Sequence, residues 1–543
     1  MLSFAEPETL AQDRKRLKTL SDASASSTPK DKRNVVQIHP PSYYLVYDRL
    51  SSSHFSLPCD GFRRTYAAVC DNFRSPYREE IIWPSDLVDA ILAVVRKSST
   101  LRKLHLRNCG LKSEFLLGLC SALSANPSMP LEELDLSENC FDESKSVVQF
   151  CSCLSSLKTS LEVVKFENCG LSVKSVHALC AALSSHQEKF RVFSLADNIL
   201  KDDPRLNGGI ESLLNLLSCC SSLEVIDLSG TSIALDRIWT CLKKTCSSLH
   251  TLKLSRCVFP TAKCKDISLQ TSIKDFFASC TALKYIDMAA CSIPAETLKF
   301  LLLGLVCNQA VNDVYLNLNS IASDRQCFSV LETCAPNLRC VTELALRDNN
   351  MEVLASDIMQ SISRMPNLQR LNIGGANFTG LKKSQHRTKP HIVLDVVDMI
   401  TTDNVLQWID GSSGVGSSRL SLTELNLSDC HLGNALSSIL NALGSSPVLK
   451  ILNVSGNDVG NVGARLLAKA LQINDSLESV HIDQNQIGIE GYEELSNALT
   501  VNSSLVFMPY PVNDINECFK LNRERTEKVW LQVSIDVSVS LSV

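Results

Sequence analysis

The 543-residue sequence predicts an α/β fold, a leucine-rich repeat solenoid. The expected form is the ribonuclease-inhibitor-like horseshoe, with a parallel sheet on the concave face and helices on the convex face. One pattern, L-x-x-L-x-L-x-x-N/C, recurs along most of the chain, and segments of helical periodicity lie between its copies. A hydrophobic content of 45% is typical of a folded chain. Together these observations predict one continuous repeat array.

The copies of the pattern follow one another at nearly regular intervals. The clearest are Leu101-Arg-Lys-Leu-His-Leu-Arg-Asn-Cys109, Leu131-Glu-Glu-Leu-Asp-Leu-Ser-Glu-Asn139, Leu161-Glu-Val-Val-Lys-Phe-Glu-Asn-Cys169 and Leu449-Lys-Ile-Leu-Asn-Val-Ser-Gly-Asn457. Looser copies start at Phe190, Leu223, Leu249, Leu283, Val311, Val341, Leu368, Leu422 and Leu477, with a degenerate copy at Leu505. The interval from Leu368 to Leu422 is longer, at 54 residues. It has the length of about two repeats with the second start blurred, and we expect an insertion at about residues 380–420.

Each part of a repeat has a physical role. The L-x-L core alternates with period two, as a short strand does when one face is buried. The segments between copies, such as Phe115–Leu123 and Val462–Leu471, have helical periodicity and predict an outer layer of helices. The ninth position calls for a small polar side chain that bonds the backbone where the chain leaves the strand. The predicted ladder residues are Cys109, Asn139, Cys169, Asn198, Cys257, Cys291, Asn319, Asn349, Cys430, Asn457 and Asn485, with Thr231 and Ala376 as exceptions.

The segments on either side of the repeats have a different character. Residues 1–57 contain a Ser/Thr/Pro/Lys-rich tract and predict a mostly disordered leader, and residues 58–100 predict an N-terminal linker or cap. The array itself is expected to cover residues 101–506. Residues 507–543 begin with two prolines that break the repeat, and Ile515–Val533 predicts a helix. We expect this last part to be a C-terminal cap and the start of a truncated helical domain.

Charge and hydropathy exclude several classes of function. Lys+Arg number 53 and Asp+Glu 58, which gives a net charge of −5 and no basic field for a nucleic-acid partner. The apolar runs, such as Phe300–Val306, are too short to span a bilayer, and the first residues do not resemble a secretory signal. We therefore expect a cytoplasmic chain.

The 23 cysteines predict reduced thiols. The chain has no secretory signal, and no C-x-x-C pair suggests a metal site. Five cysteines occupy ladder positions. Others, including Cys120, Cys180 and Cys307, are expected on the apolar face of helices, where a free cysteine packs as a small hydrophobic residue.

Catalytic motifs are absent from the sequence. It contains no His-Glu-x-x-His, no G-x-S-x-G and no Walker-type phosphate loop, and the glycine-rich stretch Gly411–Ser418 has no lysine after its last glycine. We expect a protein that is not an enzyme, with no catalytic residues, no cofactor and no metal.

The concave face is the expected partner-binding surface. The residue between the second and third leucine positions of each repeat points onto it. Neighbouring repeats offer opposite charges there, which favours an oriented protein partner over a polyanion. The candidate protein contacts are Lys103, His105, Arg107, Glu133, Asp135, Lys165, Asp227, Lys253, Asp287 and Tyr315.

Four segments are more specific than the repeats. They are Pro58-Cys-Asp-Gly-Phe-Arg-Arg-Thr-Tyr-Ala-Ala-Val-Cys70, Arg78-Glu-Glu-Ile-Ile-Trp83, Ala470-Leu-Gln-Ile-Asn-Asp-Ser-Leu477, and Phe507-Met-Pro-Tyr-Pro-Val-Asn-Asp514 leading to Glu524-Arg-Thr-Glu-Lys-Val-Trp530. Over about residues 58–533, these segments resemble the CARMIL family, the linkers of capping protein, Arp complex and myosin-I, also called leucine-rich-repeat F-actin-uncapping proteins.

The resemblance implies a non-enzymatic scaffold that regulates actin filament assembly through protein binding by its repeats. It implies roles in capping protein regulation, actin-based motility and lamellipodium organisation, and a place at the cytoskeleton and the leading-edge plasma membrane. The alternative is a generic leucine-rich-repeat binding module, such as an inhibitor or a GTPase regulator.

The sequence departs from the family plan at both ends. The first 57 residues are too short for the PH-like domain that the resemblance implies, and the chain ends at Val543, before the proline-rich tail that carries the capping-protein-interaction motif. Proteins of the actin machinery are the expected partners, but the usual capping-protein site is expected to be absent from this chain. Membrane association and dimerisation are left open.

Overall fold

The computed structural model describes residues 85–200, 210–233, 235–259, 266–321, 325–350, 355–376, 422–433 and 436–539. In these ranges, short parallel strands alternate with helices, and the predicted leucine-rich repeat solenoid is confirmed. The chain divides into two compact units, Met1–Phe190 and Arg191–Val543. The predicted leader, most of the N-terminal linker or cap, and the insertion at about residues 380–420 lie outside the described residues.

The described part of the first unit, from residue 85 onward, contains three copies of the strand–helix repeat. Its elements are α4 (Ser85–Lys97), β1 (Lys103–His105), α5 (Ser113–Ala125), β2 (Glu133–Asp135), α6 (Ser144–Leu154), β3 (Val163–Lys165), α7 (Val173–Leu183) and the 3₁₀ turn η2 (Ser184–His186). Strands β1, β2 and β3 pair in parallel, with Leu104 opposite Leu134 and Leu134 opposite Val164. These three middle residues are fully buried, so the strands turn their apolar side toward the helices.

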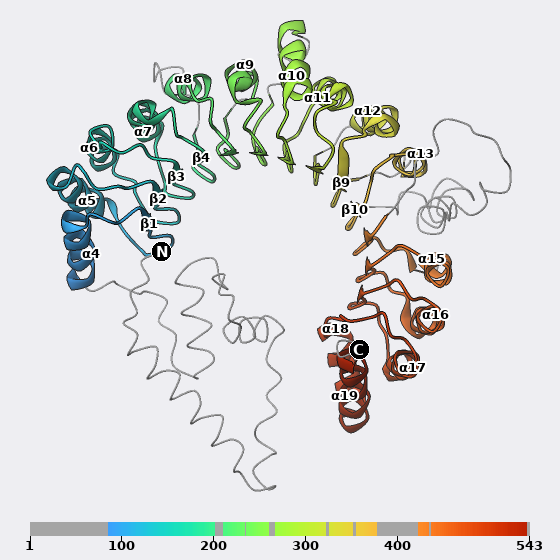
Figure 1. The fold of residues 1–543 in the computed structure, drawn as a ribbon. Coiled ribbons are helices and arrows are strands. Elements are labelled where there is room, and N and C mark those ends of the chain that lie inside the picture. The colour runs from blue at the N-terminus through green and yellow to red at the C-terminus, as the bar shows by residue number, and fades with distance from the viewer. Residues whose placement is uncertain are drawn as a thin grey trace, which may run out of the picture. The chain divides into compact units, whose positions relative to one another are not determined.

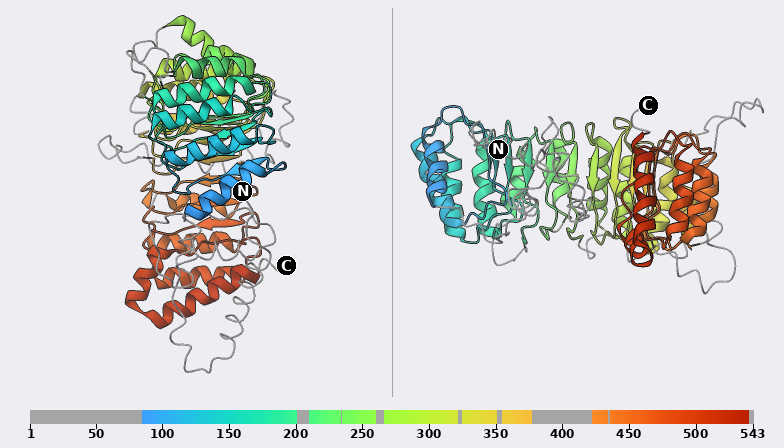
Figure 2. Two further views of the ribbon diagram at one scale, coloured as in Figure 1. Left: turned by 90° about the vertical axis from the view of Figure 1, so that its left-hand side faces the viewer. Right: turned by 90° about the horizontal axis from the view of Figure 1, so that it is seen from below.

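The second unit continues the same repeat. Its first elements are β4 (Val192–Ser194), α8 (Glu211–Cys219), β5 (Val225–Asp227), α9 (Ile238–Cys241), η3 (Leu242–Thr245), β6 (Thr251–Lys253), α10 (Ile267–Ser279), β7 (Tyr285–Asp287), α11 (Ala295–Cys307), β8 (Val314–Asn317), α12 (Arg325–Cys334), η5 (Ala335–Asn337) and β9 (Val341–Ala345). Then come α13 (Ala355–Ile362), β10 (Arg370–Asn372), β11 (Glu424–Asn426), α15 (Leu436–Leu443), β12 (Ile451–Asn453), α16 (Gly460–Leu471), β13 (Ser479–His481), α17 (Ile489–Leu499), α18 (Val512–Leu521) and α19 (Arg523–Val539). Within this unit the strands line the inside of an arc and the helices lie outside it (Figure 1). The helices run side by side in one layer, as the turned views show (Figure 2).

The long interval between Leu368 and Leu422 spans a single step of the sheet. Strand β10 pairs directly with β11, and Leu371 lies opposite Leu425. The interpretation of this interval as two repeats of the array is therefore wrong, because β10 and β11 are direct neighbours in the described sheet.

The C-terminal segment forms two helices, and the expectation of a single helix over Ile515–Val533 is wrong. Asn522 separates α18 from α19 because its backbone is extended, with φ −155° and ψ 96°. Its side-chain oxygen accepts the N–H of Arg525 at 3.1 Å and so caps the start of α19.

Asparagines at the ninth repeat position connect each repeat to the preceding one. The Asn139 oxygen accepts the N–H groups of Cys109 (3.1 Å) and Leu111 (3.0 Å). Its amide nitrogen donates to the carbonyls of Leu106 and Leu136, both at 2.8 Å. One buried side chain thus satisfies four backbone groups at the ends of two strands.

Cysteines at the ninth position make a simpler contact. Cys169 donates its S–H to the Leu136 carbonyl at 3.3 Å, and Cys291 donates to Leu254 at 2.7 Å. Burial raises the pKa of Cys169 to about 12, so the thiol stays protonated and remains a donor. A thiol has one S–H donor and a weakly accepting sulfur, so a ladder cysteine replaces the asparagine bonds with fewer and weaker ones.

The repeat at β8 is displaced by two residues from the predicted frame. Asn317, rather than Tyr315, pairs with Asp287 of β7, and a register irregularity follows Val314. The ladder position is accordingly occupied by Ile321, whose N–H bonds the Asn349 oxygen at 3.0 Å. The assignment of Asn319 to the ladder is wrong, and the sequence misled because its alternating apolar residues fit the L-x-L core in two frames.

A second set of polar side chains lies at the opposite end of the strands, and sequence reasoning missed it. Asn474 donates to the carbonyls of Leu443 and Ser446 and accepts the N–H of Leu477. The corresponding residues are Asn126, Asn308 and Asn502. The sequence signal is an asparagine shortly after the helix in these repeats, three to five residues before the next strand motif.

His186 takes the same place in its repeat. Its Nε2 donates to the Leu154 carbonyl at 3.0 Å, and its Nδ1 accepts the Leu161 N–H at 3.2 Å. The ring is 2% exposed, and burial lowers its pKa. Only the neutral ring can accept the Leu161 N–H.

We expect the stability of the first unit to fall as the pH drops below about 6.5. Above that pH His186 is neutral in both states. Below it His186 becomes protonated in the unfolded chain but stays neutral in the folded one, because its pKa is lowered there. Proton binding to the unfolded chain then favours unfolding, until the pH falls below the pKa of the folded state. Urea denaturation at pH 7.5 and 5.5 measures the loss. His186→Asn is the matched control, because asparagine makes these bonds in other repeats, and an equal pH dependence in that variant would contradict the assignment.

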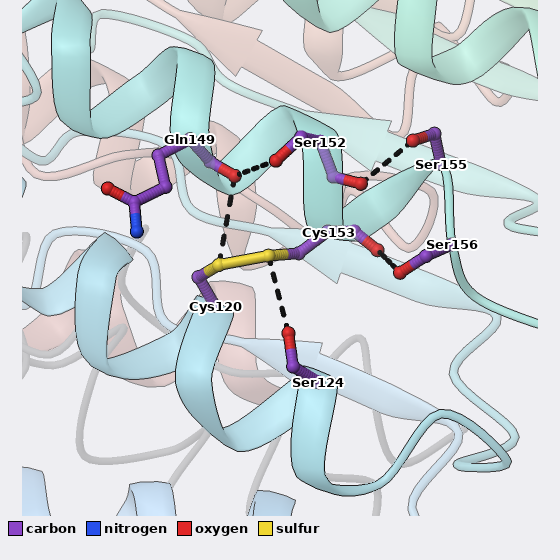
Figure 3. Close-up of a disulfide and its surroundings, with 7 residues drawn as sticks. All are labelled: Cys120, Ser124, Gln149, Ser152, Cys153, Ser155 and Ser156. Atoms are coloured by element: carbon purple, nitrogen blue, oxygen red, sulfur yellow. Dashed lines mark hydrogen bonds between the residues drawn. A yellow bond between two sulfur atoms is a disulfide. The ribbon is translucent and has the colours of Figure 1, made fainter.

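Two of the cysteines are joined rather than free, which corrects the expectation of reduced thiols throughout. Cys120 of α5 and Cys153 of α6 form a disulfide across neighbouring helices, with 5.7 Å between their Cα atoms (Figure 3). The Ser124 hydroxyl lies 3.5 Å from the Cys153 sulfur. Sequence reasoning assessed each cysteine on its own helix and did not consider two helices stacked one repeat apart. Cys180 is buried as expected, but Cys307 is exposed at the end of α11, which is a further correction.

Asp514 closes the C-terminal end of the ladder. Its carboxylate accepts the N–H groups of Asn485 and Gln486, at 3.0 Å and 2.9 Å, and the Tyr492 hydroxyl donates to it at 3.4 Å. Asp514 is 5% exposed. It occupies the place that the next ladder asparagine would take, so the first turn of α18 ends the repeat pattern.

Candidate functional site

The side of each sheet that faces away from the helices carries the predicted contact residues. In a three-residue strand such as β1, the middle residue Leu104 is buried, while Lys103 and His105 lie on the other side. We call this side the open face; it consists of the residues flanking the buried middle position of each strand. Nine of the ten predicted contacts lie at strand positions of this face, and Arg107 follows β1 by two residues.

The open face of the first unit is tied together by ion pairs. Glu133 of β2 binds Lys103 at 2.7 Å and His105 at 3.0 Å. Burial alone would raise the pKa of Glu133, but the bond from Lys103 outweighs burial and lowers it. Burial lowers the pKa of His105 in spite of the nearby carboxylates of Asp135 and Glu133.

Arg107 bridges the next two repeats. Its guanidinium donates to Glu138 at 2.8 Å and to Glu167 at 2.6 Å. Burial would lower the pKa of Arg107, but these two bonds outweigh it and raise the pKa. Most of the basic side chains predicted here as partner contacts are therefore already paired with carboxylates of neighbouring repeats. Lys165 differs, because it makes no ion pair with any described residue.

The second unit presents a charged and aromatic cluster on its open face. Lys253 lies 3.7 Å from Asp227 and 5.8 Å from the centre of the Tyr285 ring. The Tyr285 and Tyr315 rings lie 4.8 Å apart between their centres. Because of the two-residue displacement at β8, Tyr315 occupies the first strand position beside Tyr285, not the third position that the sequence suggested. The structure thus brings four predicted contacts together, namely Asp227, Lys253, Asp287 and Tyr315.

The third strand position carries a recurring turn that sequence reasoning missed. The Asp287 side chain accepts the N–H of Ala289, two residues on, at 3.0 Å. Asn426 does the same for Ser428 at 2.9 Å. The other residues that make this bond are Asp135, Asp227, Asn317, Asn372 and Asn453. Since either Asp or Asn serves the turn, the choice between them sets the charge of the open face independently of the fold.

A hollow of about 320 Å³ lies on the open face between β8 and β13. Its polar walls include Tyr315, the ion pair of Glu343 with Arg370, and the amides of Asn372, Asn426 and Asn453. The amide oxygens of these asparagines are held by the turn just described, so their NH₂ groups are left to face the hollow. Such a surface offers hydrogen-bond donors to a ligand without a strong charge.

The described residues show neither of two other kinds of site. Among them, no group of three or more His, Cys, Asp or Glu side chains is placed to hold a metal ion. No helix in the described part of the chain is long and apolar enough to cross a membrane.

Comparisons with known proteins agree with the repeat architecture. A family model described as "CARMIL family, LRR domain" matches residues 84–539. The human capping protein, Arp2/3 and myosin-I linker protein 3 is 27% identical in an alignment of 530 residues that covers 88% of this chain and 37% of that protein. The protein CARMIL of Dictyostelium discoideum is 24% identical over 538 residues, covering 88% of this chain and 48% of that protein. The chain thus spans less than half the length of these relatives.

Solved structures give a weaker likeness. The crystal structure of an internalin from Listeria monocytogenes matches with a TM-score of 0.33 at 14% identity, and covers 79% of this chain and 92% of that chain.

Proposed function

Since the chain belongs to the CARMIL family, we propose that it is a non-enzymatic scaffold that regulates actin filament assembly by binding proteins on its open face. The observation that carries the proposal is the family match over residues 84–539, joined to an open face rich in charged, aromatic and amide side chains. Two relatives of this family are named for linking capping protein, Arp2/3 and myosin-I. We propose the same machinery as the source of partners for this chain, with capping protein regulation as the outcome and the cytoskeleton at the leading edge as its place.

Unpaired charges on the open face support a binding role. Lys165 of β3 has no ion-pair partner among the described residues, unlike Lys103 on β1. A charged side chain that makes no ion pair within the protein can bind a partner without breaking an internal contact. Lys165 is therefore the residue of the first unit through which partner binding is best tested.

Purified chain should bind at least one of capping protein, Arp2/3 complex and myosin-I in a saturable way, as measured by cosedimentation or fluorescence anisotropy. We expect Lys165→Glu to weaken that binding about tenfold, which corresponds to about 1.4 kcal/mol. The matched control is Lys174→Glu on the exposed side of α7, which should bind as the unchanged chain does. Failure of all three proteins to bind would contradict the proposal and favour a generic repeat module.

A further inference from the structure

Asp287 is a charged group on the open face that makes no direct ion pair with a described residue. One of its oxygens accepts the Ala289 N–H. Among the described residues, no Lys, Arg or His forms an ion pair with Asp287. The carboxylate of Asp227, by contrast, lies 3.7 Å from the Lys253 nitrogen. Burial, together with the Asp227 charge, raises the pKa of Asp287 and outweighs the Ala289 N–H bond and the nearby charges of Lys253 and Arg256, which lower it.

Two tyrosines stand beside this carboxylate. Tyr285 lies two residues before Asp287 on β7, and Tyr315 of β8 lies opposite Tyr285. Both rings are partly exposed, and neither hydroxyl has a hydrogen-bond partner among the described residues. Rigid aromatic side chains with a polar end are typical of the residues that contribute most to protein–protein binding.

The cluster already accepts a cation near one of its rings. Lys253 lies on β6, the strand next to that of Tyr285, and its nitrogen is 5.8 Å from the centre of the Tyr285 ring. No such contact is made with the Tyr315 ring among the described residues. The Tyr315 face and the second oxygen of Asp287 are therefore available to an incoming positive group.

We propose that Asp287, Tyr285 and Tyr315 form an anchoring site for an arginine side chain of a polypeptide partner, whose main chain continues over the hollow of Asn372, Asn426 and Asn453. Arginine fits better than lysine, because a planar guanidinium stacks on an aromatic ring while it donates to a carboxylate. The proposal deepens the proposed function, on which it rests, by naming the chemistry of the partner.

The amides of the hollow suit the chain on either side of such an arginine. Their oxygens are occupied by backbone N–H groups, and their NH₂ groups have no partner among the described residues. Main-chain carbonyl groups of an extended partner are the acceptors that such a row can bind without regard to sequence. The arginine would then supply specificity, and the amides would hold the backbone.

The test uses the full chain and a random dodecapeptide library displayed on phage. We expect the selected peptides to be enriched in arginine. A selected peptide, synthesised with a fluorescent label, should bind the chain in a fluorescence anisotropy titration. Replacing its arginine with citrulline, which keeps the shape and removes the charge, should weaken binding at least tenfold. Asp287→Asn should weaken binding of the arginine peptide to the same degree, and in that variant citrulline should cost little more.

Asp287→Asn is expected to leave the fold intact, because Asn317 and Asn372 make the same turn bond in this sheet. Asp135→Asn is the matched control, since Asp135 makes this bond on β2 of the other unit, and it should bind the peptide unchanged. A library that gives no binders, binders without arginine enrichment, or an arginine peptide that binds equally to Asp287→Asn would overturn the proposal. No actin-machinery protein enters this assay, so its failure is distinct from failure of the proposed function.

Discussion

Replacing Asn457 with alanine should lower the free energy of unfolding by about 3–5 kcal/mol, because three buried backbone groups would each lose a bond worth about 1–3 kcal/mol. The side chain is fully buried. Its oxygen accepts the Leu432 N–H at 3.1 Å, and its nitrogen donates to the carbonyls of Leu427 and Val454 at 2.8 Å and 3.0 Å. Urea denaturation measures the loss, and hydrogen exchange at the Leu432 amide should show where protection disappears.

Two further variants, Asn453→Ala and Asn457→Cys, test whether the loss in Asn457→Ala comes from the ladder bonds. Asn453→Ala, four residues away on the open face, removes one bond to a partly exposed turn, so we expect it to cost about 1 kcal/mol or less. Asn457→Cys should fall between the two, since a thiol can still donate to the Leu427 carbonyl as Cys430 donates to Ile373. The ladder explanation would be wrong if Asn457→Ala were no more damaging than Asn453→Ala.

Replacing Asp514 with alanine should cost about 3 kcal/mol, since the buried N–H group of Asn485 and the partly buried N–H group of Gln486 would lose their acceptor. These groups lie where the last repeat meets α18. Because a repeat contacts only its neighbours, the loss should be confined to the C-terminal repeats. Hydrogen exchange at the amides of Asn485 and Gln486 measures it, alongside the shift in the urea midpoint.

The pKa of Asp514 decides what a gentler substitution should do. Burial raises that pKa, in spite of the backbone N–H bonds that lower it, so the site disfavours the ionised carboxylate. A neutral amide keeps an acceptor oxygen, and we therefore expect Asp514→Asn to cost less than about 1 kcal/mol. Asp475→Ala, at an exposed loop position, serves as the control and should be nearly neutral. Equal losses for the Asp514→Ala and Asp514→Asn variants would show that the bonds to Asn485 and Gln486 are not the cause.

The sequence predicted what depends on spacing within one repeat. Strands at Leu104, Leu134 and Leu452 follow from the L-x-L core, because burial of one strand face imposes the period that the pattern shows. The pattern failed at β8, where Val314, Leu316 and Leu318 satisfy the core in two frames. Pairing with β7 selects the second frame, and that pairing is a property of the neighbouring strand.

Features that join two repeats were the ones missed. The disulfide of Cys120 with Cys153, and the bonds of His186 to Leu154 and Leu161, connect residues that are 25 to 33 positions apart. A pattern that scores each repeat separately does not contain such pairs. The same reasoning explains the candidate site. The sequence placed Asp287 on the correct face, but the lack of a direct ion pair between Asp287 and another described residue became visible only with the strands on both sides in position.

The turn at the third strand position also affects how the charge of the open face can change during evolution. Codons for aspartate and asparagine differ by one nucleotide, and both residues hold the same backbone N–H in this sheet, as Asp287 and Asn317 show. A single point mutation can therefore add or remove a negative charge on one repeat while keeping the bond that holds its turn. The charge of the open face can therefore evolve one repeat at a time, and each single substitution keeps the turn bond that the fold requires.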